Sequence, residues 1–336
     1  MLIDLTGAFL GLSLLLYCLL GGADFGAGIL EIFMKPKNRK LQKETIDRAI
    51  GPVWEANHMW LVLAVVILFN GFPKAYTTLS TTYYIPLTLL LVGITLRGCA
   101  FTFGHYDAVK DGSQRYYSLI FRISAVMVPM TLGMIAGGTF LGKGGTGDFV
   151  SSYIHPWFNL LSLSVGFFTS AIFGFLAAVY LVGETREPKI QVLFAQRAKA
   201  FNIGAVITGS LVFASAQWEG LPLMSLFIHK PLSSISMAGA TLILFPLWLA
   251  LKSRQIFYLR VLAAAQVVFI LTGWFSLQFP VLIASPAGAV TLYSAAAPEI
   301  TLKYLLAALG VGSLLIFPSL FYLFKIFKYP ARKDVS

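Results

Sequence analysis

Apolar residues gather in nine runs along the chain, each about long enough to cross a membrane. A hydrocarbon core of about 30 Å requires roughly 20 apolar residues in a helix. The runs cover residues 6–30, 52–72, 80–104, 118–141, 157–182, 200–217, 233–251, 256–279 and 302–325. Continuous runs of this length exclude a membrane barrel, whose strands are about 10 residues long and alternate in polarity. The pattern therefore predicts an all-α integral membrane protein with about nine transmembrane helices.

The runs divide into two similar sets with one helix left over. Residues 1–142 contain the first four runs and residues 156–279 the next four, with comparable lengths. We therefore expect two four-helix bundles, with the ninth helix at 302–325 as an addition. The connections are too short for a soluble domain, so residues 1–336 should form a single polytopic membrane domain.

Three connections differ from the others in composition. The segments 31–49 and 183–199 are basic and occupy matching positions in the two sets, and we expect them to be loops. The segment 280–301 is apolar but is interrupted by Pro280, Pro286 and Pro298. Because proline breaks helices, this segment should not span the membrane and should pack on the protein or at the interface.

Composition and charge support a membrane location. Hydrophobic residues make up 57% of the chain and charged residues only 12%, about half of the charged fraction of a soluble domain, which is about 25%. The net charge of +11 could indicate nucleic acid binding, but its distribution indicates topology instead. If the N-terminus lies outside, all but four of the 25 Lys and Arg residues fall on inner segments, the outer four being Lys74, Lys143, Lys230 and Lys303. This asymmetry follows the positive-inside rule and predicts a cytoplasmic C-terminus.

Charged residues inside spanning helices are costly and indicate function. Asp24 and Arg97 fall at similar depth in the first and third helices, toward the inner side. They could form a structural ion pair, or Asp24 could act as a proton carrier. The nearby Gly21, Gly22, Gly26 and Gly28 have the small-residue spacing that allows helices to approach closely.

Glu55 and His58 fall on one face of the second helix, with Trp54 one turn before His58. Glu55 could complement the dipole of the helix start, or it could form a proton entry point together with His58. A metal site is a third alternative, because Glu-x-x-His occurs in di-iron bundles, but those bundles need the motif twice. We therefore expect no metal. His58, and less directly His105, are the histidines placed to ligate a haem, and we expect none to be held wholly by this chain.

Three segments carry a family resemblance. GGADFGAG (21–28), GPVWEANHMWL (51–61) and LRGCAF (96–101) resemble, in order and spacing, subunit II of cytochrome bd-type quinol oxidases, including the cyanide-insensitive branch. The W-[DE]-x-N-x-x-W-L block is the most specific part. The chain departs from the family pattern at Gly21, where an acid is usual, at Glu55, where Asp is commoner, and at Thr102 and Gly104, where Glu and Arg are frequent.

The resemblance implies a bacterial cytoplasmic membrane complex that oxidises quinol and reduces oxygen to water. Subunit I would carry haem b and haem d, and subunit II would stabilise it. The acid after the helix-two tryptophan, here Glu55, would help deliver cytoplasmic protons. Family members can also hold a structural quinone, contact lipid and bind a small accessory subunit. Two other functions fit the residues alone, namely a secondary transporter and a purely structural assembly subunit.

Overall fold

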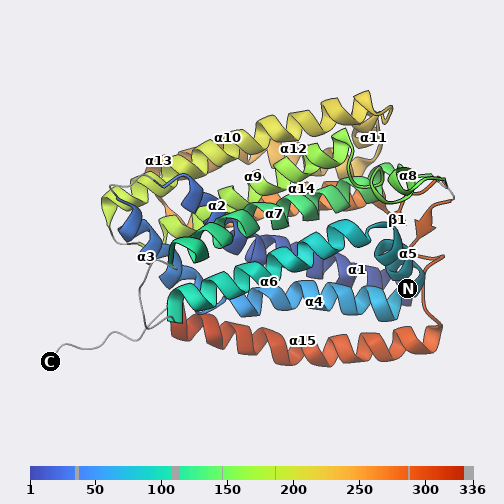
Figure 1. The fold of residues 1–336 in the computed structure, drawn as a ribbon, viewed down its shortest axis with the longest axis horizontal. Helices are drawn as coiled ribbons and strands as arrows, with labels where there is room; N and C mark the ends of the chain where they lie inside the picture. Colours follow the sequence, from blue (N-terminus) through green and yellow to red (C-terminus); the bar gives the residue numbers. More distant parts are fainter. Residues whose placement is uncertain (35–37, 107–113, 146, 186, 287, 329–336) are drawn as a thin grey trace.

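The computed structural model describes residues 1–34, 38–106, 114–145, 147–185, 187–286 and 288–328 as a bundle of long helices that share one axis (Figure 1). Eight helices in these ranges are long and apolar enough to cross a membrane, and the number rises to nine when a bent pair of helices is counted as one span. The predicted all-α membrane fold with about nine spans is therefore confirmed.

The first four crossings lie between residues 2 and 141. Span one is a continuous helix in three parts: α1 (Leu2–Leu16), the π-helical turn η1 (Tyr17–Gly21) and α2 (Gly22–Ile32). In span two, α3 (Arg39–Ile50) and α4 (Trp54–Gly71) meet at a bend of 54°. Spans three and four are α6 (Tyr84–Tyr106) and α7 (Gln114–Leu141).

The remaining crossings begin with α9 (Leu160–Val182) and α10 (Pro188–Trp218). Span seven is divided into α12 (Pro231–Leu242) and α13 (Leu244–Ser253). Pro246 explains the division. Proline has no backbone N–H to donate to the carbonyl four residues earlier, and its ring clashes with that carbonyl in a regular helix. Spans eight and nine are α14 (Ile256–Gln278) and α15 (Glu299–Lys328).

Short elements cap one end of the bundle. These are α5 (Pro73–Thr82), α8 (Phe149–Tyr153), α11 (Leu223–His229) and the antiparallel strands β1 (Val281–Ile283) and β2 (Val290–Thr291). Figure 1 shows them at the end where α1 begins, which we call the α5 end; α3 lies at the opposite end, the α3 end. The segment 280–301 is not a spanning helix and it packs on protein, as predicted: the Ala284 amide donates to the Thr139 carbonyl at 2.8 Å, and the Ala297 amide to the Gly71 carbonyl at 2.9 Å.

Two predicted boundaries were wrong. Residues 39–49 and 188–199 were expected to lie in loops, but they belong to α3 and to the first turns of α10. Both segments are polar enough to lie beyond the hydrocarbon core and still continue as helix, so the apolar pattern alone does not show where the helices begin. The sixth span, expected to be the shortest at 200–217, is consequently a helix of 31 residues.

Lys74, Lys143, Lys230 and Lys303 lie in or beside elements of the α5 end or in the first turns of α15, which starts there. This placement agrees with the alternation on which the topology prediction rests. Lys35, Lys37, Lys110, Arg186, Arg332 and Lys333, all predicted to be inner, lie outside the described residues. The orientation of the chain in the membrane stays a prediction.

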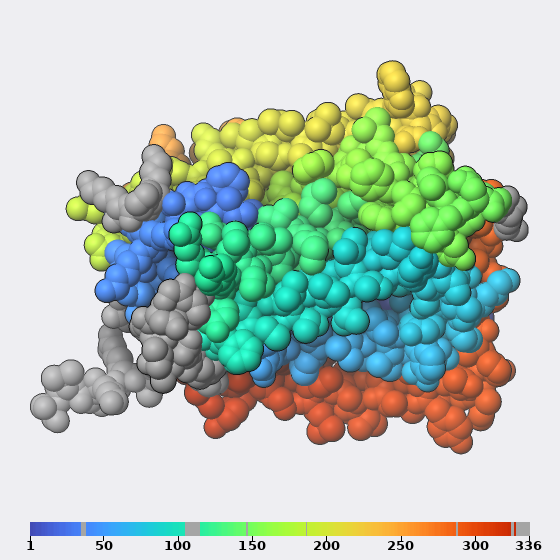
Figure 2. Space-filling view, in the orientation of Figure 1, coloured from blue at the N-terminus to red at the C-terminus, as the bar shows by residue number. Residues whose placement is uncertain are grey.

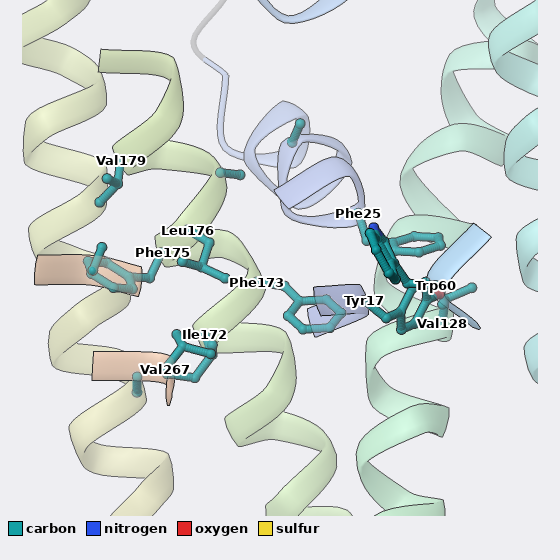
Figure 3. Close-up of a cluster of buried hydrophobic side chains, with 14 of the residues drawn as sticks. Tyr17, Phe25, Trp60, Val128, Ile172, Phe173, Phe175, Leu176, Val179 and Val267 are labelled. Carbon is teal, nitrogen blue, oxygen red and sulfur yellow. The ribbon is translucent and has the colours of Figure 1, made fainter. Parts of the chain in front are cut away.

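The core of the bundle is centred on α9, which packs against α2, α7, α10 and α14. Figure 3 shows Phe173 of α9 between the Tyr17–Phe25 region and the aliphatic cluster around Leu176. One continuous hydrophobic cluster includes buried residues from both predicted four-helix sets, such as Phe25 and Val267. At the periphery, α15 runs beside α4 (Figure 2), and large apolar side chains such as Leu314 and Phe321 face outward from it.

Candidate functional site

Asp24 lies in the first turn of α2, directly after the π-helical turn, and its side chain is only 3% exposed. Its Oδ2 accepts a hydrogen bond from Nδ2 of Asn57 at 2.9 Å. Asn57 is itself 5% exposed and lies on α4. A carboxylate in an apolar bundle is costly unless it is hydrogen-bonded, so this bond both satisfies Asp24 and ties α2 to α4.

Arg97, on α6, is the largest fully buried side chain in the described part of the chain, at 1% exposure. Its guanidinium carbon lies 4.6 Å from the centre of the Phe25 ring and 5.4 Å from that of Phe121. These are cation–π contacts, which gain strength where water is excluded. Phe25 directly follows Asp24 in α2, so its contact with Arg97 places the guanidinium beside the part of α2 that carries the carboxylate. The structure therefore brings Asp24 and Arg97 into one neighbourhood, and whether they form a structural pair or a proton route stays a prediction.

His58 joins the same neighbourhood from α4. Its ring lies 5.5 Å from Phe25, 6.0 Å from Tyr17 and 6.2 Å from Trp54, measured between ring centres. Its Nδ1 is buried and has no hydrogen-bond partner among the described residues, and the same holds for Nε and Nη2 of Arg97 and the hydroxyl of Tyr17. We call Tyr17, Asp24, Asn57, His58 and Arg97 the buried polar cluster.

Glu55 does not belong to this cluster. It lies in the first turn of α4 and its side chain is exposed, whereas Asn57, two residues later, is buried. Two residues correspond to about 200° around a helix, so the two side chains leave α4 in nearly opposite directions. The position of Glu55 at the helix start fits the dipole alternative, and its exposure leaves it accessible to a partner or to water.

Sequence reasoning missed three polar sites at the α3 end. Asn57 stands in the quoted motif and could have been found by the cost of burying an amide in a spanning helix. Glu31 is buried and accepts from the Ser118 hydroxyl at 2.5 Å and from Arg39 at 3.5 Å. Glu184 pairs with Arg260 at 2.8 Å, although the two residues are 76 positions apart. No local signal in the sequence indicates that last pair.

The described residues contain no group of three or more His, Cys, Asp or Glu side chains that could hold a metal ion. His58 is surrounded by aromatic rings of its own chain. The side chain of His105, the other haem-ligand candidate, lies outside the described residues.

Comparisons with known proteins agree with the resemblance in the motifs. The family model for cytochrome bd terminal oxidase subunit II matches residues 2–327. The cytochrome bd ubiquinol oxidase subunit 2 of Bacillus subtilis (strain 168) is 29% identical over 149 residues, 44% of this chain and 43% of that protein. The cytochrome bd-I ubiquinol oxidase subunit 2 of Escherichia coli (strain K12) is 26% identical over 93 residues, 28% and 24% of the two chains. The chain thus aligns with less than half the length of either relative.

A structural comparison extends over nearly the whole chain. A chain of the solved bd oxidase from Geobacillus thermodenitrificans superposes with a TM-score of 0.80 and covers 98% of this chain and 99% of its own length. Its sequence identity is 19%, so this likeness concerns the fold.

Proposed function

Since the chain belongs to the cytochrome bd terminal oxidase subunit II family, we propose that it serves as subunit II of a quinol:oxygen oxidoreductase in the aerobic respiratory chain. Its partner is a haem-bearing subunit I, which holds haem b and haem d and which this chain stabilises. The complex reduces oxygen to water with electrons from quinol. The observation that carries this proposal is the family match over residues 2–327.

The assembly is tested by purifying this chain through a tag in a mild detergent. We expect a stoichiometric complex with a second membrane subunit and with the visible bands of haem b and haem d. A small accessory subunit and a bound quinone would be found in the same preparation. A chain that purifies alone, stable and monodisperse, and that transports a solute unaided would instead support the secondary transporter.

Within the complex, we assign to this subunit a cytoplasmic proton route that starts at Glu55 and includes Trp54 and His58. Two features support the assignment. Glu55 is exposed at the start of α4, so a subunit docked on that face can receive its proton. One turn further along the helix, His58 lies within the buried polar cluster, where Asp24 and Arg97 supply further charged groups.

The Glu55→Gln variant tests the route. It removes the ionisable group and keeps the shape, so assembly and haem spectra should be unchanged. Quinol-driven oxygen consumption should fall by about 100-fold, the lower end of what positioned proton transfer contributes. Glu44→Gln, which alters another exposed acid at the same end, is the matched control and should retain full activity. Wild-type turnover in Glu55→Gln would leave a purely structural assembly subunit as the better description.

A further inference from the structure

A cavity of about 210 Å³ lies between α2, α3, α4, α9 and α14 at the α3 end of the bundle. Four of the residues that line it are strongly polar: Asp24, Asn57, Glu184 and Arg260. Apart from Tyr180, the remaining wall is aliphatic and includes four alanines, among them Ala23 and Ala177. At roughly 15–30 Å³ for each water molecule, the cavity has space for on the order of ten.

The exposure of the charged side chains falls along the cavity from the Glu184–Arg260 pair to Asp24. The Arg260 side chain is 33% exposed and that of Glu184 is 20% exposed, whereas Asp24 is 3% exposed. Glu184 follows directly after the last turn of α9, and Arg260 lies in the first turns of α14. The Glu184–Arg260 pair therefore stands at the mouth, and Asp24 lies at the inner end.

Two hydrogen bonds hold the Arg260 guanidinium in place at the mouth of the cavity. Nη2 of Arg260 donates to Oε1 of Glu184 at 2.8 Å and to the carbonyl oxygen of Tyr180 at 3.0 Å. Gly183 leaves room for this guanidinium, because a Cβ at that position would lie 2.4 Å from Nη2. The ion pair thus lies across the last turn of α9 and beside the opening.

The polar groups beyond Asp24 point to water independently of the cavity. The hydroxyl of Tyr17 and two guanidinium nitrogens of Arg97 are fully buried and have no hydrogen-bond partner among the described residues. Both residues lie beside Asp24 and Asn57 in the bundle, because Arg97 packs over the ring of Phe25, the residue after Asp24, and Tyr17 contacts the ring of His58, the residue after Asn57. Buried polar groups are nearly always satisfied by protein or by ordered water, and a cavity lined by polar groups fills with water whereas a purely apolar one stays dry.

We propose that this cavity is a water-filled vestibule through which the cytoplasm hydrates Asp24, with the Glu184–Arg260 pair at its mouth. It enters between α9 and α14, on the side of α4 opposite to Glu55, and so provides a second access to the buried polar cluster. The observations that support the water pathway do not depend on the oxidase function proposed above. Only the use of the pathway for protons consumed in oxygen reduction rests on that function.

Cysteine labelling in the assembled complex tests the vestibule. In a background with Cys18→Ala and Cys99→Ala, Ala177→Cys places a thiol on the cavity wall, and Ala178→Cys, its neighbour on α9, places one in the fully buried core outside that wall. The probe is a membrane-impermeant cationic methanethiosulfonate, applied to inside-out membrane vesicles. The thiolate is the reacting species and needs water, so Ala177→Cys should react about tenfold or more faster than Ala178→Cys. Right-side-out vesicles should show no such labelling.

Two further variants keep the test decisive. Ala23→Cys lines the same cavity from α2 and replaces Ala177→Cys if that variant does not assemble. Arg260→Ala should raise the labelling rate severalfold, because it removes the side chain across the mouth and leaves the Glu184 carboxylate to attract the cationic probe. Equal rates at positions 177 and 178, or labelling only from the outside, would overturn the vestibule.

The proton role has its own readout. If protons reach Asp24 through the vestibule, the bulky label on Ala177→Cys should lower quinol-driven oxygen consumption, and removing it with a reducing agent should restore the rate. Full activity of the labelled complex would overturn the proton role while leaving the water pathway in place. Failure of the proposed oxidase function would be seen separately, as a complex without haem, whereas the labelling pattern would be unaffected.

Discussion

At the scale of single residues, Asn57 has a role that its neutral side chain does not suggest. Its amide donates to the Asp24 carboxylate at a point where both side chains are almost completely buried. Hydrogen bonds to charged groups contribute about 1.5–3 kcal/mol, and removing the donor also leaves the buried acceptor with a desolvation cost. Asn57 therefore stabilises the charge of Asp24, which belongs to both the proposed proton route and the proposed vestibule.

Replacing Asn57 by Leu should accordingly lower the stability of the purified complex by about 2 kcal/mol, measured as a lower midpoint of thermal unfolding. Asn70→Leu is the control, since Asn70 lies on the same helix but is exposed, and its side-chain amide donates to the Val66 carbonyl one turn earlier. If the carboxylate causes the loss, Asp24→Leu combined with Asn57→Leu should be less destabilised than Asn57→Leu alone. An unchanged midpoint in Asn57→Leu would show that this bond contributes nothing.

At the scale of elements, the contact between α2 and α9 depends on glycine. A Cβ at Gly26 would lie 1.9 Å from the carbonyl oxygen of Phe173, and a Cβ at Gly22 would lie 2.7 Å from the Phe173 ring. The backbones approach so closely because small residues stand one turn apart, as in other membrane helix pairs. The glycine spacing therefore has the packing role that the sequence predicted for it.

Gly26→Ala should force the two helices apart, because the atom in conflict belongs to the main chain and cannot rotate away. Overpacking costs about 1–3 kcal/mol or more, and we expect less complex in the membrane and faster loss of haem bands on heating. Gly204→Ala on α10 is the control, since nothing lies within 4 Å of a Cβ there. Equal yield and heat resistance in the two variants would contradict the close approach.

At the scale of the whole molecule, the two predicted four-helix sets share one core. The central helix α9 belongs to the second set, yet it packs on α2 and α7 of the first. The vestibule is built in the same way, with Asp24 and Asn57 from one set and Glu184 and Arg260 from the other. The division at residues 142 and 156 stays a prediction about repeated architecture, whereas folding and the site both require the two sets together.

The sequence by itself determined what depends on local composition. Lipid requires about 20 apolar residues for each crossing and penalises charge within it, so the number of spans and the non-helical segment 280–301 could be read from the chain. The same rule singled out Asp24, Glu55, His58 and Arg97 as candidates, and their functional roles stay predictions. Where helices such as α3 and α10 begin was not visible, because polar turns beyond the hydrocarbon core leave no apolar pattern.

Only the tertiary structure decided which of these residues meet. The Asn57–Asp24 bond joins positions 33 apart, and the Glu184–Arg260 pair joins positions 76 apart. Such contacts depend on the rotation and close approach of helices, which are set by packing at residues like Gly26 and not by the polarity of the partners. For the same reason the outward direction of Glu55, away from the buried polar cluster two residues along the same helix, became known only when the helices were packed together.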